Sequence, residues 1–183
     1  MNFRSRNLGA LVLLACSAAS AASPPLSDGR IDIPRLGVSG AIREGADDDT
    51  LRVAIGHVPG TALPGSTGNV ALAAHRYSYF KGLRGVRKGD EITVTTRGES
   101  FHYEVDRIDV VEVTNVAVLA QTPDPTLTLI TCYPFDYVGP APQRLIVRAH
   151  RTDLLHASNP SDASTRESPE DSGAPSRSIP SRK

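Results

Sequence analysis

Residues 91–105 read EITVTTRGESFHYEV, and this stretch decides the class of fold. Apolar side chains alternate with polar ones in residues 91–96 and again in residues 101–105, which is the period of a half-buried β-strand. Residues 97–99 (RGE) separate the two runs and supply a tight turn. We therefore predict a β-hairpin whose His102 faces solvent.

Other segments also have the composition of short strands, being rich in Val, Ile, Leu or Thr and mostly bounded by Gly, Pro or Asn. These segments are residues 52–58, 69–74, 107–113, 126–132 and 144–149. Two short helical turns are predicted as well, one capped within residues 47–50 and one after Ser78 that points Phe80 and Leu83 inward. Six or seven short strands joined by tight turns predict an all-β fold, either a barrel or a sandwich.

The composition excludes several classes of protein. The chain has 183 residues, its 20 Lys+Arg balance its 20 Asp+Glu, and 14 Pro and 15 Gly divide it into short segments. A net charge of zero provides no field that attracts a polyanion, so we expect no nucleic-acid partner. The hydrophobic content of 39% is that of a folded protein, and the lack of a long helical period argues against an all-helical one.

Both ends of the chain differ in composition from its middle. Residues 1–27 begin with basic residues, continue with a short apolar run and finish with small residues, as in a secretory signal peptide or an N-terminal membrane anchor. Leu13-Leu14-Ala15-Cys16 resembles a lipobox, so cleavage, retention and lipidation at Cys16 all stay open. Residues 158–183 are rich in Ser, Pro and charged residues, which predicts a disordered tail. We assign one domain to residues 28–157 and expect an exported protein.

Cys132 is the first candidate for chemistry. It follows an apolar run, residues 127–131, and Pro134 stands two residues later. A side chain at the end of a strand is held by a rigid element and still reaches solvent, which suits a nucleophile. Two alternatives need no chemistry: a small buried hydrophobic residue, or a disulfide with Cys16, which removal of a signal peptide would prevent.

A histidine and an arginine could assist such a nucleophile. His75 also ends an apolar strand, and an imidazole can both stabilise a thiolate and protonate a leaving amine. His57, before a Pro-Gly turn, is its competitor. Arg144 begins the strand after Cys132, and its permanent charge suits a developing oxyanion. Arg148 stands four residues later on the same strand face and is the rival arginine.

Together these segments resemble the sortases, the cysteine transpeptidases that attach proteins to bacterial surfaces. The matching pieces are Thr128-Leu129-Ile130-Thr131-Cys132, the His75-Arg76 pair after residues 69–74, and residues 144–147 (RLIV). Ile33-Pro34-Arg35-Leu36 and residues 56–65 (GHVPGTALPG) are also similar to sortase sequence, nearest to classes D and E. The resemblance covers residues 31–149, and the loop at residues 133–142 is similar to that of sortases from Gram-negative bacteria.

The resemblance implies a closed eight-stranded β-barrel and a thioester mechanism. Cys132 attacks the Thr-Gly bond of an LPxTG-like sorting signal, His75 protonates the departing amine, and Arg144 stabilises the oxyanion or holds the substrate backbone. Thr131 is expected to assist in the oxyanion pocket, and His57 is a further expected contact to the substrate. An amine then releases the acyl group, and no cofactor or metal takes part.

The expected partners are a secreted protein that carries an LPxTG-like signal and an acceptor amine of unknown kind. We expect a monomer associated with the membrane through its N-terminus, in the periplasm or at the outer face of the cytoplasmic membrane. Two alternatives stay open: an exported cysteine peptidase that only hydrolyses such peptides, and a non-enzymatic, surface-anchored β-barrel that binds a partner.

Overall fold

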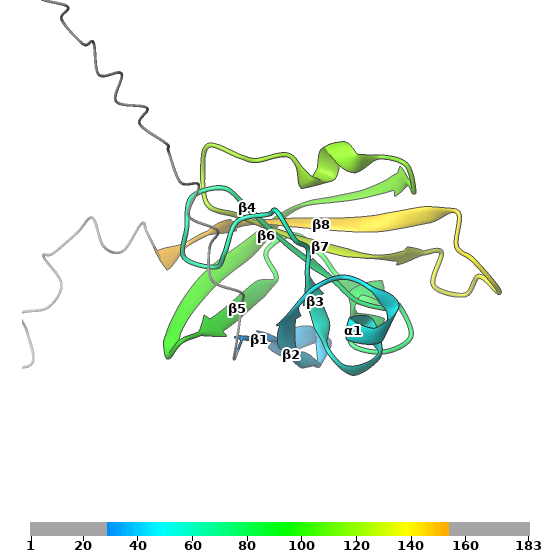
Figure 1. Ribbon diagram of the computed structural model, residues 1–183, viewed down its shortest axis with the longest axis horizontal. Helices are drawn as coiled ribbons and strands as arrows, with labels where there is room; N and C mark the ends of the chain where they lie inside the picture. Colours follow the sequence, from blue (N-terminus) through cyan, green and yellow to red (C-terminus); the bar gives the residue numbers. More distant parts are fainter. Residues whose placement is uncertain (1–28, 154–183) are drawn as a thin grey trace, which may run out of the picture.

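Eight strands close into a barrel in the computed structural model, which describes residues 29–153 (Figure 1). The order around the barrel is β1-β2-β3-β4-β7-β8-β6-β5, and the β2–β3 and β4–β7 pairs are parallel. The strands are β1 (Gly29–Ile33), β2 (Val38–Glu44), β3 (Ile55–His57), β4 (Asn69–Ala73), β5 (Glu91–Thr96), β6 (Glu99–Glu112), β7 (Thr126–Tyr133) and β8 (Gln143–Arg151). Helical segments in this part of the chain are short: η1 (Pro34–Leu36), α1 (Asp48–Val53), η2 (Lys81–Gly85) and η3 (Val116–Leu119). The predicted all-β barrel is confirmed.

The predicted hairpin is the β5–β6 pair. Thr96 pairs with Glu99, which leaves Arg97 and Gly98 as a two-residue turn. Both have positive φ, 51° and 81°, as the right-handed twist of a tight hairpin requires. His102 is exposed on β6, as predicted.

Three strand predictions need correction. Residues 52 and 53 belong to helix α1, because Asp47 caps its start by accepting a hydrogen bond from the Thr50 amide at 3.0 Å. Residues 107–113 are not a separate strand, since β6 runs on from the hairpin and shifts its register between Val105 and Arg107. β1 and β2 were missed because β1 has only five residues and Gly40-Ala41 interrupts the alternation of β2.

Alternate side chains of each strand fill the barrel. On the strands that carry the candidate site, the inward residues are Val70 and Leu72 of β4, Leu127 and Leu129 of β7, and Leu145 and Val147 of β8. Each is at most 6% exposed. The residues between them point to the outer face of the barrel, where the β6–β7 connection (residues 113–125) passes across the sheet (Figure 1).

Candidate active site

Cys132 and Arg144 are directly opposite partners in the antiparallel β7–β8 pair. Their neighbours Thr131 and Leu145 are buried, so Cys132 and Arg144 share the outer face of the sheet. Directly opposite residues have Cβ atoms about 4.5–5.5 Å apart. The side chains of Cys132 and Arg144 therefore leave two rigid strands at directly opposite positions.

His75 reaches the same place through the parallel β4–β7 pair. The register pairs Ala73 with Ile130, and the Ala74 amide still donates to the Ile130 carbonyl at 3.2 Å. Continuing this register by two residues sets His75 beside Cys132, on the outer face because Ala74 points inward. We call His75, Cys132 and Arg144 the Cys132 row.

Within residues 29–153, the guanidinium of Arg144 makes hydrogen bonds through Nη1 alone. Its Nη1 donates to the carbonyls of Ala141 at 3.1 Å and Gln143 at 2.9 Å, which fixes the side chain at the start of β8. Within residues 29–153, Arg144 forms no ion pair with a carboxylate. A half-buried cation without a counter-ion suits a site where negative charge develops.

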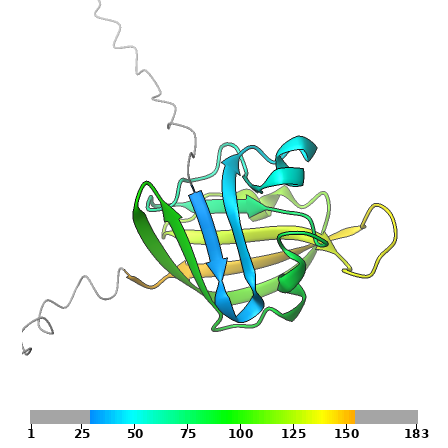
Figure 2. The same ribbon diagram turned by 90° about the horizontal axis from the view of Figure 1, so that it is seen from below.

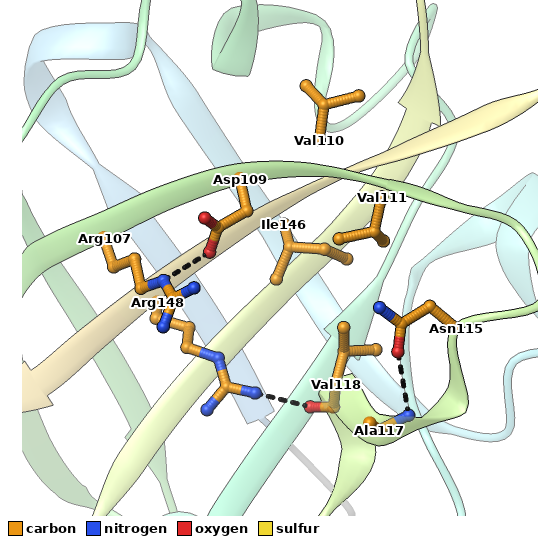
Figure 3. A pocket seen from close by; sticks show the side chains of 9 residues that line it. All are labelled: Arg107, Asp109, Val110, Val111, Asn115, Ala117, Val118, Ile146 and Arg148. Carbon is orange, nitrogen blue, oxygen red and sulfur yellow. Dashed lines mark hydrogen bonds and ion pairs between the residues drawn. The ribbon is translucent and has the colours of Figure 1, made fainter.

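Arg148 shares the outer face with Arg144, but its side chain is hydrogen-bonded to the β6–β7 connection. Its Nη2 donates to the Val118 carbonyl at 3.2 Å, and it lines a groove of about 310 Å³ between β6, β8 and the β6–β7 connection (Figure 3). Arg107, also in this groove, pairs with Asp109 at 2.6 Å. The register sets Arg148 opposite Thr128, four residues before Cys132, so Arg144 is the arginine of the Cys132 row.

The β6–β7 connection is fastened to the sheet by a buried amide. Asn69 is fully buried, and its Nδ2 donates to the carbonyls of Val118 at 2.9 Å and Ala120 at 3.2 Å. The hydroxyl of Thr128, also fully buried, donates to Asn69 Oδ1 at 2.7 Å. This network fixes the connection as a wall beside the Cys132 row.

The β7–β8 connection (residues 134–142) extends beyond one end of the barrel (Figure 2) and forms a second wall. Arg76, next to His75, donates to the carbonyls of Tyr137 at 2.6 Å and Gly139 at 3.2 Å. At the base of the loop, Arg84 makes a bidentate pair with Asp136 at 2.7 and 2.6 Å and lowers the pKa of that carboxyl. The loop is thus held from both sides.

The sequence of this chain matches a known protein family. The model of the sortase domain matches residues 31–152. The chain belongs to the sortase family.

Relatives of this sortase come from several sortase classes. Sortase D of Bacillus subtilis (strain 168) is 32% identical over 126 residues, which are 68% of this chain and 64% of that protein. The solved structure of the Clostridium perfringens sortase D5 transpeptidase has a TM-score of 0.62 and 35% identity, over 68% of this chain and 78% of that one. A lid mutant of sortase A from Corynebacterium diphtheriae has a TM-score of 0.64 and 37% identity, over 76% and 75%.

Thr131 lies next to Cys132 but faces the other way. It is 2% exposed, and its hydroxyl donates to the Ala74 carbonyl at 2.8 Å. The bond joins the residue before Cys132 to the residue before His75, so the geometry favours a positioning role for Thr131 over direct contact with an oxyanion.

His57 is held inside this sortase, away from solvent. It is 2% exposed, with Nδ1 at 2.8 Å from Glu44 Oε2 and Nε2 at 2.9 Å from the Ala62 carbonyl and 3.1 Å from Thr61 Oγ1. Both ring nitrogens are therefore engaged, and the geometry favours a structural role over the predicted contact with substrate.

Sequence reasoning missed the roles of two residues, Asn69 and Tyr77. Asn69 was read only as the start of a strand, and Tyr77, which follows the His75-Arg76 pair, was given no role. An aromatic residue two positions after a strand-end histidine is a usable signal for Tyr77, whereas only the fold reveals what Asn69 binds.

Two features are absent from residues 29–153. In this range no three His, Cys, Asp or Glu side chains gather as metal ligands would. Nor does this range contain a helix of the length and apolar character needed to cross a membrane.

Proposed function

We propose that this sortase is a cysteine transpeptidase that cleaves an LPxTG-like sorting signal between Thr and Gly and transfers the Thr acyl group to an amine. The observation that carries the proposal is the register of β4, β7 and β8, which pairs Cys132 with Arg144 and pairs Ala73 with Ile130, each two residues before His75 and Cys132. The row has a nucleophile, an acid and base, and a donor for the oxyanion.

The first half of the reaction forms a thioester. The Cys132 thiolate attacks the Thr carbonyl carbon, and Arg144 donates to the oxygen that becomes negative. His75 gives its proton to the Gly nitrogen as the C–N bond breaks and the C–S bond remains. In the second half an acceptor amine attacks the thioester, His75 removes its proton, and Cys132 leaves as the thiolate.

The proposed substrate is a secreted protein with the sorting signal near its C-terminus, and the proposed site of action is outside the cytoplasm. The basic and apolar composition of residues 1–27 supports export, either as a cleaved signal or as an anchor. Residues 1–27 and 158–183 lie outside the described residues, so the signal and the tail remain predictions.

Intact-protein mass spectrometry with an LPxTG peptide tests the proposal. Wild type should gain the mass of the acyl fragment, and Cys132→Ala should gain none while keeping its circular dichroism spectrum. With hydroxylamine or a Gly peptide present, the aminolysis product should exceed the hydrolysis product. A peptide with the LPxTG residues scrambled should give no adduct.

Each other outcome selects a rival. An adduct that persists in Cys132→Ala would reject Cys132 as the nucleophile. Hydrolysis that is unaffected by added amine would indicate a peptidase. Tight binding of the peptide without any covalent adduct in wild type would indicate a binding module.

A further inference from the structure

The imidazole of His75 is covered on one face by the ring of Tyr77. The ring centroids are 5.0 Å apart and the planes are 11° from parallel. Tyr77 is 71% exposed, so burial does not account for its position. Among residues 29–153, the His75 side chain has no hydrogen bond and no ion pair, which leaves this stack as its one polar or aromatic contact.

In cysteine and serine catalytic sites, a third group usually orients the base by accepting its second ring N–H. No such acceptor reaches His75 from the described part of the chain. We propose that Tyr77 is the positioning residue of this site, orienting the imidazole of His75 by stacking instead of by a hydrogen bond. This inference rests on the proposed function and names a residue that orients the imidazole of His75.

The local backbone holds the two rings together before any substrate arrives. The His75 carbonyl accepts from the amides of Ser78 and Phe80, both at 3.3 Å, so the chain turns back at Tyr77. Phe80 is fully buried and anchors the far end of this turn in the core. Arg76 fastens the near end to the β7–β8 loop through the Tyr137 carbonyl. The stack is therefore part of the folded structure.

The stack also sets the electron-rich face of a phenol ring against the imidazole. Such a face attracts a cation, so it suits an imidazole that carries a proton during the reaction. The imidazolium is the form that pairs with a thiolate and donates a proton to a leaving amine. Loss of the ring face should thus lower the rate of acylation more than it weakens peptide binding.

Three variants separate the ring face from the rest of the side chain. Tyr77→Phe keeps the π face and removes the hydroxyl, Tyr77→Leu keeps bulk and removes the face, and Val53→Ala trims an exposed side chain at the end of α1 as a control. The first measurement needs no substrate. In ¹H–¹³C spectra of the free protein, the ring protons of His75, assigned with His75→Asn, should show an upfield ring-current shift in wild type and Tyr77→Phe that disappears in Tyr77→Leu.

The second measurement is the steady-state kinetics of thioester formation. Tyr77→Leu should lower kcat by about two- to fivefold, the range of a cation–π contact at an exposed site, with KM little changed. Tyr77→Phe and Val53→Ala should keep the wild-type kcat and KM.

The outcomes distinguish this inference from the proposed function. An upfield shift that persists in Tyr77→Leu would overturn the stack, whatever the enzyme does. A kcat of Tyr77→Leu that matches that of Tyr77→Phe, with wild type active, would overturn the role of Tyr77 alone. Absence of any thioester in wild type would overturn the proposed function, and the role of Tyr77 with it.

Discussion

The hydroxyl of Thr131 donates to the carbonyl of Ala74 at 2.8 Å and so ties β7, the strand that carries Cys132, to the residue between the end of β4 and His75. Both residues are buried, at 2% and 4% exposure, and the bond lies on the inner side of the sheet that carries the site. The distance between Cys132, the proposed nucleophile, and His75, the proposed acid, depends on how these two segments meet, and this bond lies where they meet.

Thr131→Val should therefore weaken both the fold and the reaction. Valine has nearly the same shape, so the main loss is the hydrogen bond to the Ala74 carbonyl, which should cost about 1–3 kcal/mol of unfolding free energy. Urea denaturation measures this loss, and kcat for thioester formation should fall with it. Thr95→Val, whose hydroxyl contacts Ser100 on an exposed hairpin, is the control and should change stability by less than about 0.5 kcal/mol. Normal stability and activity in Thr131→Val would contradict the positioning role.

Arg144 and Arg148 should respond differently to loss of charge. Arg144→Gln removes the donor of the Cys132 row and should lower kcat/KM by about 10²–10³-fold, as for a lost oxyanion donor. Arg148→Gln removes one of the bonds to the Val118 carbonyl and should act mainly on KM, through the wall of the site. Steady-state kinetics with one peptide compares the two variants. A larger fall in kcat for Arg148→Gln would show that the roles are reversed.

The parts of the fold and site that could be predicted depend on local pattern. The β5–β6 hairpin was correctly predicted because alternation and an Arg-Gly turn are contiguous in sequence. The parallel pairing of β4 with β7 joins segments more than 50 residues apart, and no periodicity reveals it. His75 and Cys132 could each be singled out as strand-end residues, but only their resemblance to a family predicted that they meet.

Burial of single polar residues was beyond sequence pattern. His57 and His75 both stand near the end of a short strand, yet one is enclosed by Glu44 and Ala62 and the other lies on the outer face. The difference arises from the β3–β4 loop, which folds back over His57. Its conformation depends on tertiary contacts that single-residue propensities do not contain.

Asn69 and Thr128 should be energetically coupled. The Thr128 hydroxyl donates to Asn69 Oδ1 with both side chains fully buried, so removing either partner leaves the other unsatisfied. A double-mutant cycle of Asn69→Ala and Thr128→Val by urea denaturation should give a coupling of about 0.5–3 kcal/mol.

An exposed hydroxyl pair provides the matched control for that cycle. Thr95 and Ser100 lie opposite each other at 3.0 Å on the hairpin, where water can replace the lost partner. A cycle of Thr95→Val and Ser100→Ala should give less coupling than the buried pair. Equal coupling in the two cycles would mean that burial does not strengthen the Asn69 network.

Asp90 should make the stability of this sortase sensitive to acid. Its side chain is 2% exposed, forms a bidentate pair with Arg35 and accepts from the Arg87 amide at 2.9 Å. The hydrogen bonds from Arg35 hold the pKa of Asp90 below its ordinary value, despite the opposing effect of burial. The folded state therefore favours the ionised carboxylate more than the unfolded chain does.

The sign of the pH dependence follows from this lowered pKa. The stabilisation by Asp90 is fully present above the unfolded pKa, about 3.9, and is lost as the pH falls through the lower folded value. Asp90→Asn should lower the unfolding free energy at pH 7 by about 1.5–3 kcal/mol, the range for hydrogen bonds to a charged group. Urea titrations from pH 7 to pH 2 should show the difference from wild type shrinking below about pH 4.

Asp124→Asn, at an exposed position that forms no ion pair within residues 29–153, should show no such trend. If the difference in unfolding free energy between wild type and Asp90→Asn stays constant down to pH 2, the ionised carboxylate of Asp90 is not the form that stabilises the fold.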